Sequence, residues 1–101
     1  MIKEGLPDAV FAASDLMALG MMRAFSEAGV RVPEDVSVVG FDDHEFARQF
    51  FPPLTTVRQD FKALGLRCLE VLLSGSDDTH LREPIRPRLL VRLSTCRKAR
   101  P

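Results

Sequence analysis

Polar residues directly after two apolar segments form the most chemically suggestive pattern in the sequence. Ser14 and Asp15 follow the apolar run 9–13, and Asp42 and Asp43 follow the β-branched run 36–41. In open parallel sheets, ligands bind just outside the carboxyl ends of the strands. A carboxylate at such an end can accept hydrogen bonds from neighbouring hydroxyls of a sugar or nucleoside. The pattern therefore predicts a binding site for a hydroxylated small molecule, and the alternative is that these residues only cap the helices that follow.

The types and spacing of the residues argue against a metal site and against an enzyme. Asp42, Asp43, His44 and Glu45 are consecutive, so they cannot all turn toward one ion, and no second histidine lies at ligand spacing. The sequence contains no nucleophile elbow, P-loop or glycine-rich phosphate fingerprint. Cys68 falls on the apolar side of an expected helix and is predicted to be a small core residue. We therefore expect no metal, no cofactor and no enzymatic activity.

Composition narrows the protein class further. The 101 residues are 46% hydrophobic and 28% charged, as in one small globular domain or part of a larger one. Fourteen basic and fourteen acidic residues give a net charge of zero, which argues against a free-standing nucleic-acid binder. The apolar runs are too short to span a membrane, and the first residues do not resemble a signal peptide. Two cysteines without a metal or redox motif fit a reducing cytoplasm.

The charge is distributed unevenly along the chain. Among the charged side chains of residues 1–50, acidic ones outnumber basic ones. Residues 82–101 instead carry seven arginines and lysines and one glutamate. Such a basic stretch fits either an anionic partner or solvated strand and terminal positions with acidic neighbours elsewhere in the fold. We favour the second interpretation, because no aromatic residues are interleaved with these arginines.

The first expected elements are a strand over 9–13 and a helix that starts after Ser14 and ends at about Ala28. Ser14 is a good N-cap, and Gly29 is a natural stop. The helix carries two apolar faces: Met17, Met21, Ala24, Phe25 and Ala28 on one, and Leu16, Leu19 and Met22 on the other. Two apolar faces require two packing partners, of which one is the sheet and the other could be a second subunit.

The remaining pattern continues the alternation of strand and helix. We expect a buried strand over 36–41, a short helix over 45–51, a strand over 54–58, a helix over about 60–73, a polar loop over 76–84 and a strand over 85–93. This order predicts an open α/β sheet. Phe46, Phe50 and Phe51, next to two prolines, form an aromatic cluster that belongs either to the core or to a dimer surface.

Four stretches of the sequence, taken together, resemble the effector-binding region of the lactose-repressor/galactose-repressor family. They are residues 7–15, 18–20, 32–43 and 52–59. The resemblance implies an incomplete periplasmic-binding-protein-like (flavodoxin-like) α/β fold with an open parallel sheet and flanking helices. In such a fold the ligand occupies a cleft between two subdomains. Residues 1–58 and 89–101 would belong to the C-terminal subdomain, and residues 59–88 would return to the N-terminal one.

The resemblance also assigns roles to individual residues. Asp42, Ser14, Gln59 and Phe61 would contact the effector, although Ser14 stands where the family usually has an asparagine. Asp15 would order the start of the helix. The dimer surface would include Leu19, Met22, Phe46, Phe50 and Phe51.

These assignments imply the C-terminal part of a cytoplasmic, homodimeric transcriptional regulator that senses a sugar or nucleoside-like effector. DNA would be bound only by an N-terminal region absent from this chain, and no membrane is involved. The isolated chain is expected to be weakly stable or to aggregate, because its partial sheet would expose apolar surface. Three alternatives remain: a fragment of a solute-binding protein for sugar uptake, a receiver-like phospho-acceptor using Asp42, Asp43 and Mg²⁺, and a fragment without a function of its own.

Overall fold

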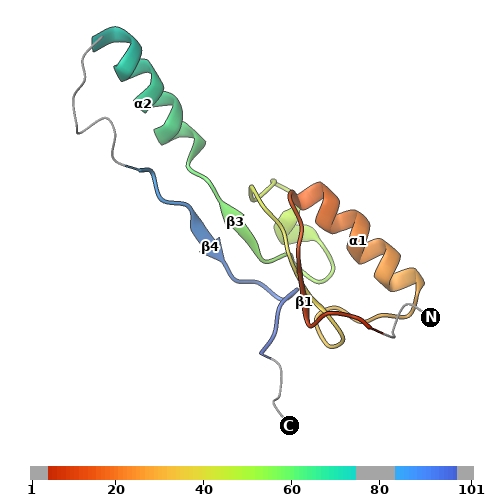
Figure 1. Ribbon diagram of the computed structural model, residues 1–101. Coiled ribbons are helices and arrows are strands. Elements are labelled where there is room, and N and C mark those ends of the chain that lie inside the picture. The colour runs from red at the N-terminus through yellow and green to blue at the C-terminus, as the bar shows by residue number, and fades with distance from the viewer. Residues whose placement is uncertain (1–4, 75–83, 98–101) are drawn as a thin grey trace. The chain divides into compact units, whose positions relative to one another are not determined.

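Residues 5–74 and 84–97 are described by a computed structural model, and these residues form seven helices and strands (Figure 1). In order they are β1 (Ala9–Phe11), α1 (Asp15–Glu27), β2 (Ser37–Val39), the 3₁₀ helix η1 (Ala47–Gln49), β3 (Thr56–Arg58), α2 (Phe61–Ser74) and β4 (Arg88–Leu90). They fall into two units. Unit 1 combines the chain up to Arg58 with the chain from Leu89 onward, and unit 2 is Gln59–Arg88.

Parallel strands form the centre of unit 1. β1 pairs with β2 in parallel, with Val10 opposite Val38, and Val39 forms a parallel bridge to Thr55 on the other side. β2 therefore lies between two neighbours, and its Val38 is fully buried. A strand covered on all sides is expected to be β-branched and apolar. The predicted α/β fold with a partial parallel sheet is confirmed.

The ends of α1 follow their local sequence signals. The Ser14 hydroxyl accepts the backbone N–H of Met17, so Ser14 is the N-cap. Gly29 follows the C-cap with φ 75°, a left-handed conformation that a glycine adopts without steric cost. Both boundaries were predicted from the sequence.

The buried side of α1 combines residues from both predicted apolar faces. The helix buries Asp15, Ala18, Met22 and Phe25, which are spaced three and four residues apart. Phe25 comes from one predicted face and Met22 from the other, whereas Leu16, Met17 and Leu19 are exposed. Hydrophobic periodicity does not register the polar Asp15, which is buried at the start of the same stripe.

The hydrophobic core of unit 1 is small and lies between α1, β2 and the turn that contains η1. Its buried members are Ala12, Ala18, Met22, Phe25, Val30, Val36, Val38, Ala47 and Leu54. Leu54 and Ala47 are joined through the backbone, since the Leu54 N–H donates to the Ala47 carbonyl at 2.9 Å. The turn around η1 thus belongs to the core that supports β2.

Several predicted elements are shorter in the structure. The helix expected over 45–51 is reduced to the three residues of η1, and the strand expected over 85–93 forms only Arg88–Leu90, which pairs with β3. Pro52 and Pro53 prevent the helix at η1 from continuing, because neither proline can donate a backbone hydrogen bond. The polar loop predicted over 76–84 lies, except for Pro84, outside the described residues.

No residue of α2 is buried. The leucines are exposed, among them Leu69, Leu72 and Leu73 at 50%, 79% and 78%. Cys68, predicted as a core residue, is exposed as well, because no other described element covers the apolar face of this helix. Within the described ranges, neither helix is long and apolar enough to cross a membrane.

Candidate functional site

The ends of β1 and β2 meet in unit 1. The Asp15 N–H donates to the Phe41 carbonyl at 3.1 Å, and the Ala12 N–H donates to the Val39 carbonyl at 2.8 Å. Ser14 directly precedes Asp15 in the sequence and Asp42 directly follows Phe41, and both Ser14 and Asp42 are partly exposed. The structure therefore brings together the two polar strand ends that the sequence singled out.

Ser14 has a structural role at this point. Its hydroxyl oxygen accepts the Met17 N–H at 3.1 Å, which confirms the predicted N-cap. A hydroxyl has one proton to donate in addition to its acceptor positions. Capping the helix therefore does not prevent Ser14 from donating to a ligand.

Asp15 is the most deeply buried charged residue near the strand ends, at 2% exposure. One carboxylate oxygen accepts the Thr56 hydroxyl at 2.6 Å, and the other accepts the backbone N–H of His44. A buried carboxylate is tolerated when its oxygens are hydrogen-bonded in this way. Asp15 therefore joins α1 to β3 and to the loop after β2, a wider role than the predicted ordering of the helix start.

The close approach of Asp15 requires a glycine opposite it. A Cβ added to Gly40 would lie 2.2 Å from the Asp15 carboxylate oxygen and 2.8 Å from Leu54 Cδ2. Both distances are too short for non-bonded atoms. Gly40 was not singled out from the sequence, although a glycine at the end of a buried strand signals close packing.

The loop 41–45 that carries Asp42 has an unusual backbone. Asp42 and Asp43 both have positive φ, at 103° and 53°. The Asp42 N–H donates to the Val57 carbonyl at 2.8 Å, and the Asp43 N–H donates to the Thr56 hydroxyl at 3.3 Å. Asp42, whose carboxylate is predicted to bind the ligand, is therefore hydrogen-bonded to β3 through its backbone N–H.

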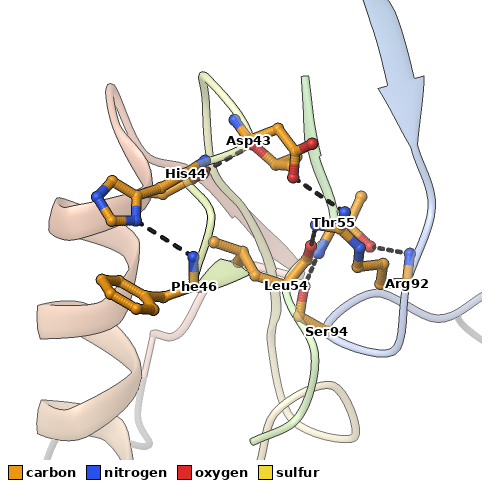
Figure 2. Close-up of polar contacts among 9 residues, drawn as sticks. Asp43, His44, Phe46, Leu54, Thr55, Arg92 and Ser94 are labelled. Atoms are coloured by element: carbon orange, nitrogen blue, oxygen red, sulfur yellow. Dashed lines mark hydrogen bonds and ion pairs between the residues drawn. The ribbon is translucent and has the colours of Figure 1, made fainter. Parts of the chain in front are cut away.

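Arg92 fixes the same loop from the other side (Figure 2). Its guanidinium forms an ion pair with Asp43 at 2.9 Å and donates to the Leu54 carbonyl at 2.9 Å. Its backbone N–H donates to the Thr55 hydroxyl at 2.8 Å. The Arg92 and Asp43 side chains are only 19% and 16% exposed. The sequence predicts solvated arginines with acidic neighbours elsewhere in the fold, and Arg92 has such a neighbour 49 residues away. Its burial was not predicted, because nothing local to Arg92 signals which partner it meets.

The residues after Arg92 complete the edge of β2. The Ser94 hydroxyl donates to the Val38 carbonyl at 2.6 Å. The same hydroxyl accepts the Thr55 N–H at 2.8 Å (Figure 2). The Val38 N–H donates to the Ser94 carbonyl at 2.9 Å. Ser94 is fully buried, so residues 92–96 are an integral part of unit 1.

The predicted dimer residues differ in their exposure. Leu19, Phe46 and Phe51 are exposed, at 42%, 51% and 99%. Phe50 is half-buried against the core, and Met22 is buried, so Met22 packs mainly within unit 1. The Phe46 ring lies 4.9 Å from the His44 ring, centre to centre (Figure 2).

An open groove adjoins the exposed phenylalanine Phe51. It has a volume of about 310 Å³, and its lining combines apolar residues, among them Met22, Val30, Phe51 and Pro52, with the polar residues Ser26, Arg31 and Glu34. The apolar part of this lining fits the predicted contact with a second subunit, which stays a prediction.

The other two predicted effector contacts, Gln59 and Phe61, belong to unit 2. Phe61 is the first residue of α2 and is 56% exposed. Gln59 borders a pocket of about 270 Å³ together with Asp60, Leu64, Arg67, Pro84, Ile85 and Pro87. Asp60 caps the start of α2 by accepting the Ala63 N–H at 2.9 Å. Across residues 5–74 and 84–97, no three His, Cys, Asp or Glu side chains are grouped to hold a metal ion.

The chain is similar in sequence to known regulators. Residues 1–95 match the model of the periplasmic binding protein-like domain family. The lactose operon repressor of Escherichia coli (strain K12) is 51% identical over 77 residues, which are 75% of this chain and 21% of that protein. The HTH-type transcriptional repressor PurR of Histophilus somni (strain 129Pt) is 39% identical over 97 residues, which are 93% of this chain and 29% of that protein.

Solved structures agree with these similarities. The lac repressor dimer bound to operator and the anti-inducer ONPF superposes with a TM-score of 0.79 at 41% identity. The superposition covers 89% of this chain and 32% of the repressor chain. A LacI family transcriptional regulator from Lactobacillus casei with bound sucrose gives a TM-score of 0.78 at 33% identity, over 94% of this chain and 36% of that one.

The chain spans only 21% to 29% of the length of the two repressors compared above. The chain belongs to the periplasmic binding protein-like domain family and corresponds to part of the effector-binding domain of the lactose-repressor/galactose-repressor family.

Proposed function

We propose that the protein carrying this chain is a cytoplasmic, homodimeric transcriptional regulator, and that unit 1 contributes Asp42 and Ser14 to the binding of a hydroxylated effector. The effector class is a sugar or a nucleoside-like compound. DNA contact is assigned to a region outside this chain. No catalytic step is assigned to any residue.

One observation supports the effector site above the others. The hydrogen bond from the Asp15 N–H to the Phe41 carbonyl holds the ends of β1 and β2 together, so that Ser14 and Asp42 occupy the same edge of the sheet. A carboxylate and a hydroxyl at one edge offer acceptors and a donor to adjacent ligand hydroxyls. Sugars are bound in related regulators, as shown by the sucrose complex described above and by the cellobiose complex of CelR.

Gln59 and Phe61 of unit 2 are proposed as further effector contacts. Phe61 is 56% exposed as a residue, and sugars and nucleosides both have apolar faces that pack on aromatic rings. Gln59 offers an amide with two donors and an acceptor.

The test uses the full-length protein that carries this sequence. Sucrose, cellobiose, lactose, adenosine and guanosine are titrated by calorimetry, and binding to the DNA upstream of its own gene is measured in parallel. We expect one of these compounds to bind and to change the DNA affinity. Asp42→Asn should weaken that compound's binding about tenfold to hundredfold, because an amide loses the charge and one of the acceptors.

A matched control is Asp8→Asn, an exposed aspartate before β1, which should leave effector affinity unchanged. Binding of a sugar without any specific DNA binding would contradict the regulator and would favour a solute-binding protein for uptake. Unchanged affinity in Asp42→Asn would contradict the assigned site.

A further inference from the structure

We propose that Arg92 and Asp43 are positioning residues that hold the loop 41–45 in the conformation needed by the Asp42 carboxylate. The inference rests on the proposed function, since it concerns the residue assigned there to effector binding. Neither side chain is assigned a ligand contact.

The loop needs external support because of its backbone. Asp42 and Asp43 are consecutive residues with a side chain, and both have positive φ. Aspartate tolerates the left-handed region better than most residues, but the value of 103° at Asp42 lies outside that well. Such conformations persist only where surrounding contacts hold them, and they concentrate at binding sites.

The support comes from two directions. On one side, the Asp42 and Asp43 N–H groups are bonded to β3 residues, and the His44 N–H is bonded to Asp15. On the other side, Arg92 is the side chain that reaches Asp43, at 2.9 Å. Arg92 holds the side chain of Asp43, and β3 holds its backbone. Asp43, which directly follows Asp42, is therefore fixed at both its side chain and its backbone.

Arg92 is itself well anchored, which makes it suitable for this role. It contacts three successive parts of the structure: the Asp43 carboxylate, the Leu54 carbonyl and, through its backbone, the Thr55 hydroxyl. A planar guanidinium can satisfy the first two acceptors at the same time, which an ammonium group does poorly.

Burial distinguishes this ion pair from an ordinary surface pair. Its two side chains are 19% and 16% exposed, whereas those of Arg23 and Glu27 on α1 are 78% and 64% exposed. Water screens an exposed pair strongly and a partly buried pair much less. The Arg23–Glu27 pair, in a helix of the same unit, is therefore a matched control.

The experiment measures backbone hydrogen exchange of the full-length protein in the segment 41–45, for the wild type and for Arg92→Met, Arg92→Lys, Asp43→Asn and Arg23→Met. We expect Arg92→Met and Asp43→Asn to speed exchange in this segment about tenfold or more, because local opening becomes easier. Arg92→Lys should restore part of the protection, and Arg23→Met should behave as the wild type in this segment.

The pattern of exchange separates positioning from general stability. Faster exchange confined to 41–45, with α1 and β1 unchanged, supports the proposal. Equal acceleration across unit 1, or no change in 41–45 in either Asp43→Asn or Arg92→Met, overturns it. Asp43→Asn keeps the bond from Arg92 to Leu54, so the test stands even where Arg92→Met fails to fold.

Ligand affinity is measured on the same variants with whichever of the five titrated compounds binds the wild type. We expect Asp43→Asn to lower the ligand affinity, and we expect Arg92→Lys to lower it less. If none of the compounds binds the wild type, the proposed effector class is wrong, while the exchange data still decide whether the ion pair holds the loop. If a compound binds and the exchange is unchanged, only the positioning role is wrong.

Discussion

Gly40 and Asp15 depend on each other at the junction of α1 and β2. The carboxylate of Asp15 reaches Thr56 and the His44 N–H only because no side chain projects from residue 40. A carboxylate in this position satisfies donors from two other segments while it is buried. The cost of burying the charge is offset by these hydrogen bonds, and the offset is lost if either partner is displaced.

Gly40→Ala is therefore expected to destabilise the protein by about 2–3 kcal/mol, because the added methyl overlaps the Asp15 carboxylate and Leu54. Urea unfolding of the full-length protein measures this change as a lower midpoint. The control is Gly20→Ala in α1, where an added Cβ meets no atom within 4 Å. That control should stabilise the helix by about 0.5–1 kcal/mol. Equal midpoints for the two variants would contradict the packing described for Gly40.

Sequence patterns predict the residues around this junction only in part. Ser14 and Gly29 are recognisable because caps are short-range features, each determined by a few neighbouring residues. The ion pair of Arg92 with Asp43 is not recognisable, since it joins residues that come together only after the sheet has formed. Asp15 shows the same limit: its residue type suggests a helix start, but its burial follows from the tertiary fold.

At the scale of elements, α1 and α2 have similar amphipathic sequences but different environments. α1 packs on β2 and buries a stripe that includes Ala18, Met22 and Phe25. α2 has no buried residue, and its exposed leucines form a face without a described partner. The sequence predicted both helices within a few residues, because periodicity identifies a helix without identifying what covers it.

The 101-residue chain alone is expected to self-associate through the apolar face of α2. Replacing Leu72 and Leu73 together by lysine should weaken this association at least about tenfold, since each leucine contributes roughly 1.5–3 kcal/mol on burial. Sedimentation velocity over a range of protein concentrations measures the effect. Ala24→Lys adds a charge at an exposed position of α1 and should leave the association unchanged. Monodisperse behaviour of the unmodified chain would refute this expectation.

At the scale of the whole molecule, the exposed aromatic surface of unit 1 fits assembly into a dimer. Phe51 is 99% exposed beside an open groove, and a large apolar side chain in that position gains by contact with a second subunit. The lac repressor structure compared above is described as a dimer. The homodimer assigned under the proposed function therefore has a specific candidate contact.

Phe51→Ala in the full-length protein is expected to weaken dimerisation by about 2 kcal/mol, or roughly thirtyfold, while leaving the fold intact. Analytical ultracentrifugation at low micromolar concentration measures the shift toward monomer. Phe11→Ala removes the same side chain from β1, where it is 63% exposed, and serves as the control. A dimer of unchanged affinity in Phe51→Ala would place the subunit contact elsewhere.

The hydrogen bonds of Ser94 also constrain the order of events during synthesis. Ser94 lies 56 residues after Val38 and 39 residues after Thr55, and all of unit 2 is translated between β3 and Ser94. Contacts between residues so distant along the chain require the closure of long loops and slow folding. Unit 1 therefore cannot mature on the ribosome before unit 2 has been synthesised, and the backbone N–H and carbonyl of Val38 lack their Ser94 partners throughout that interval. A chaperone that shields exposed backbone groups would have its longest opportunity to bind β2 during that interval, before Ser94 has been synthesised.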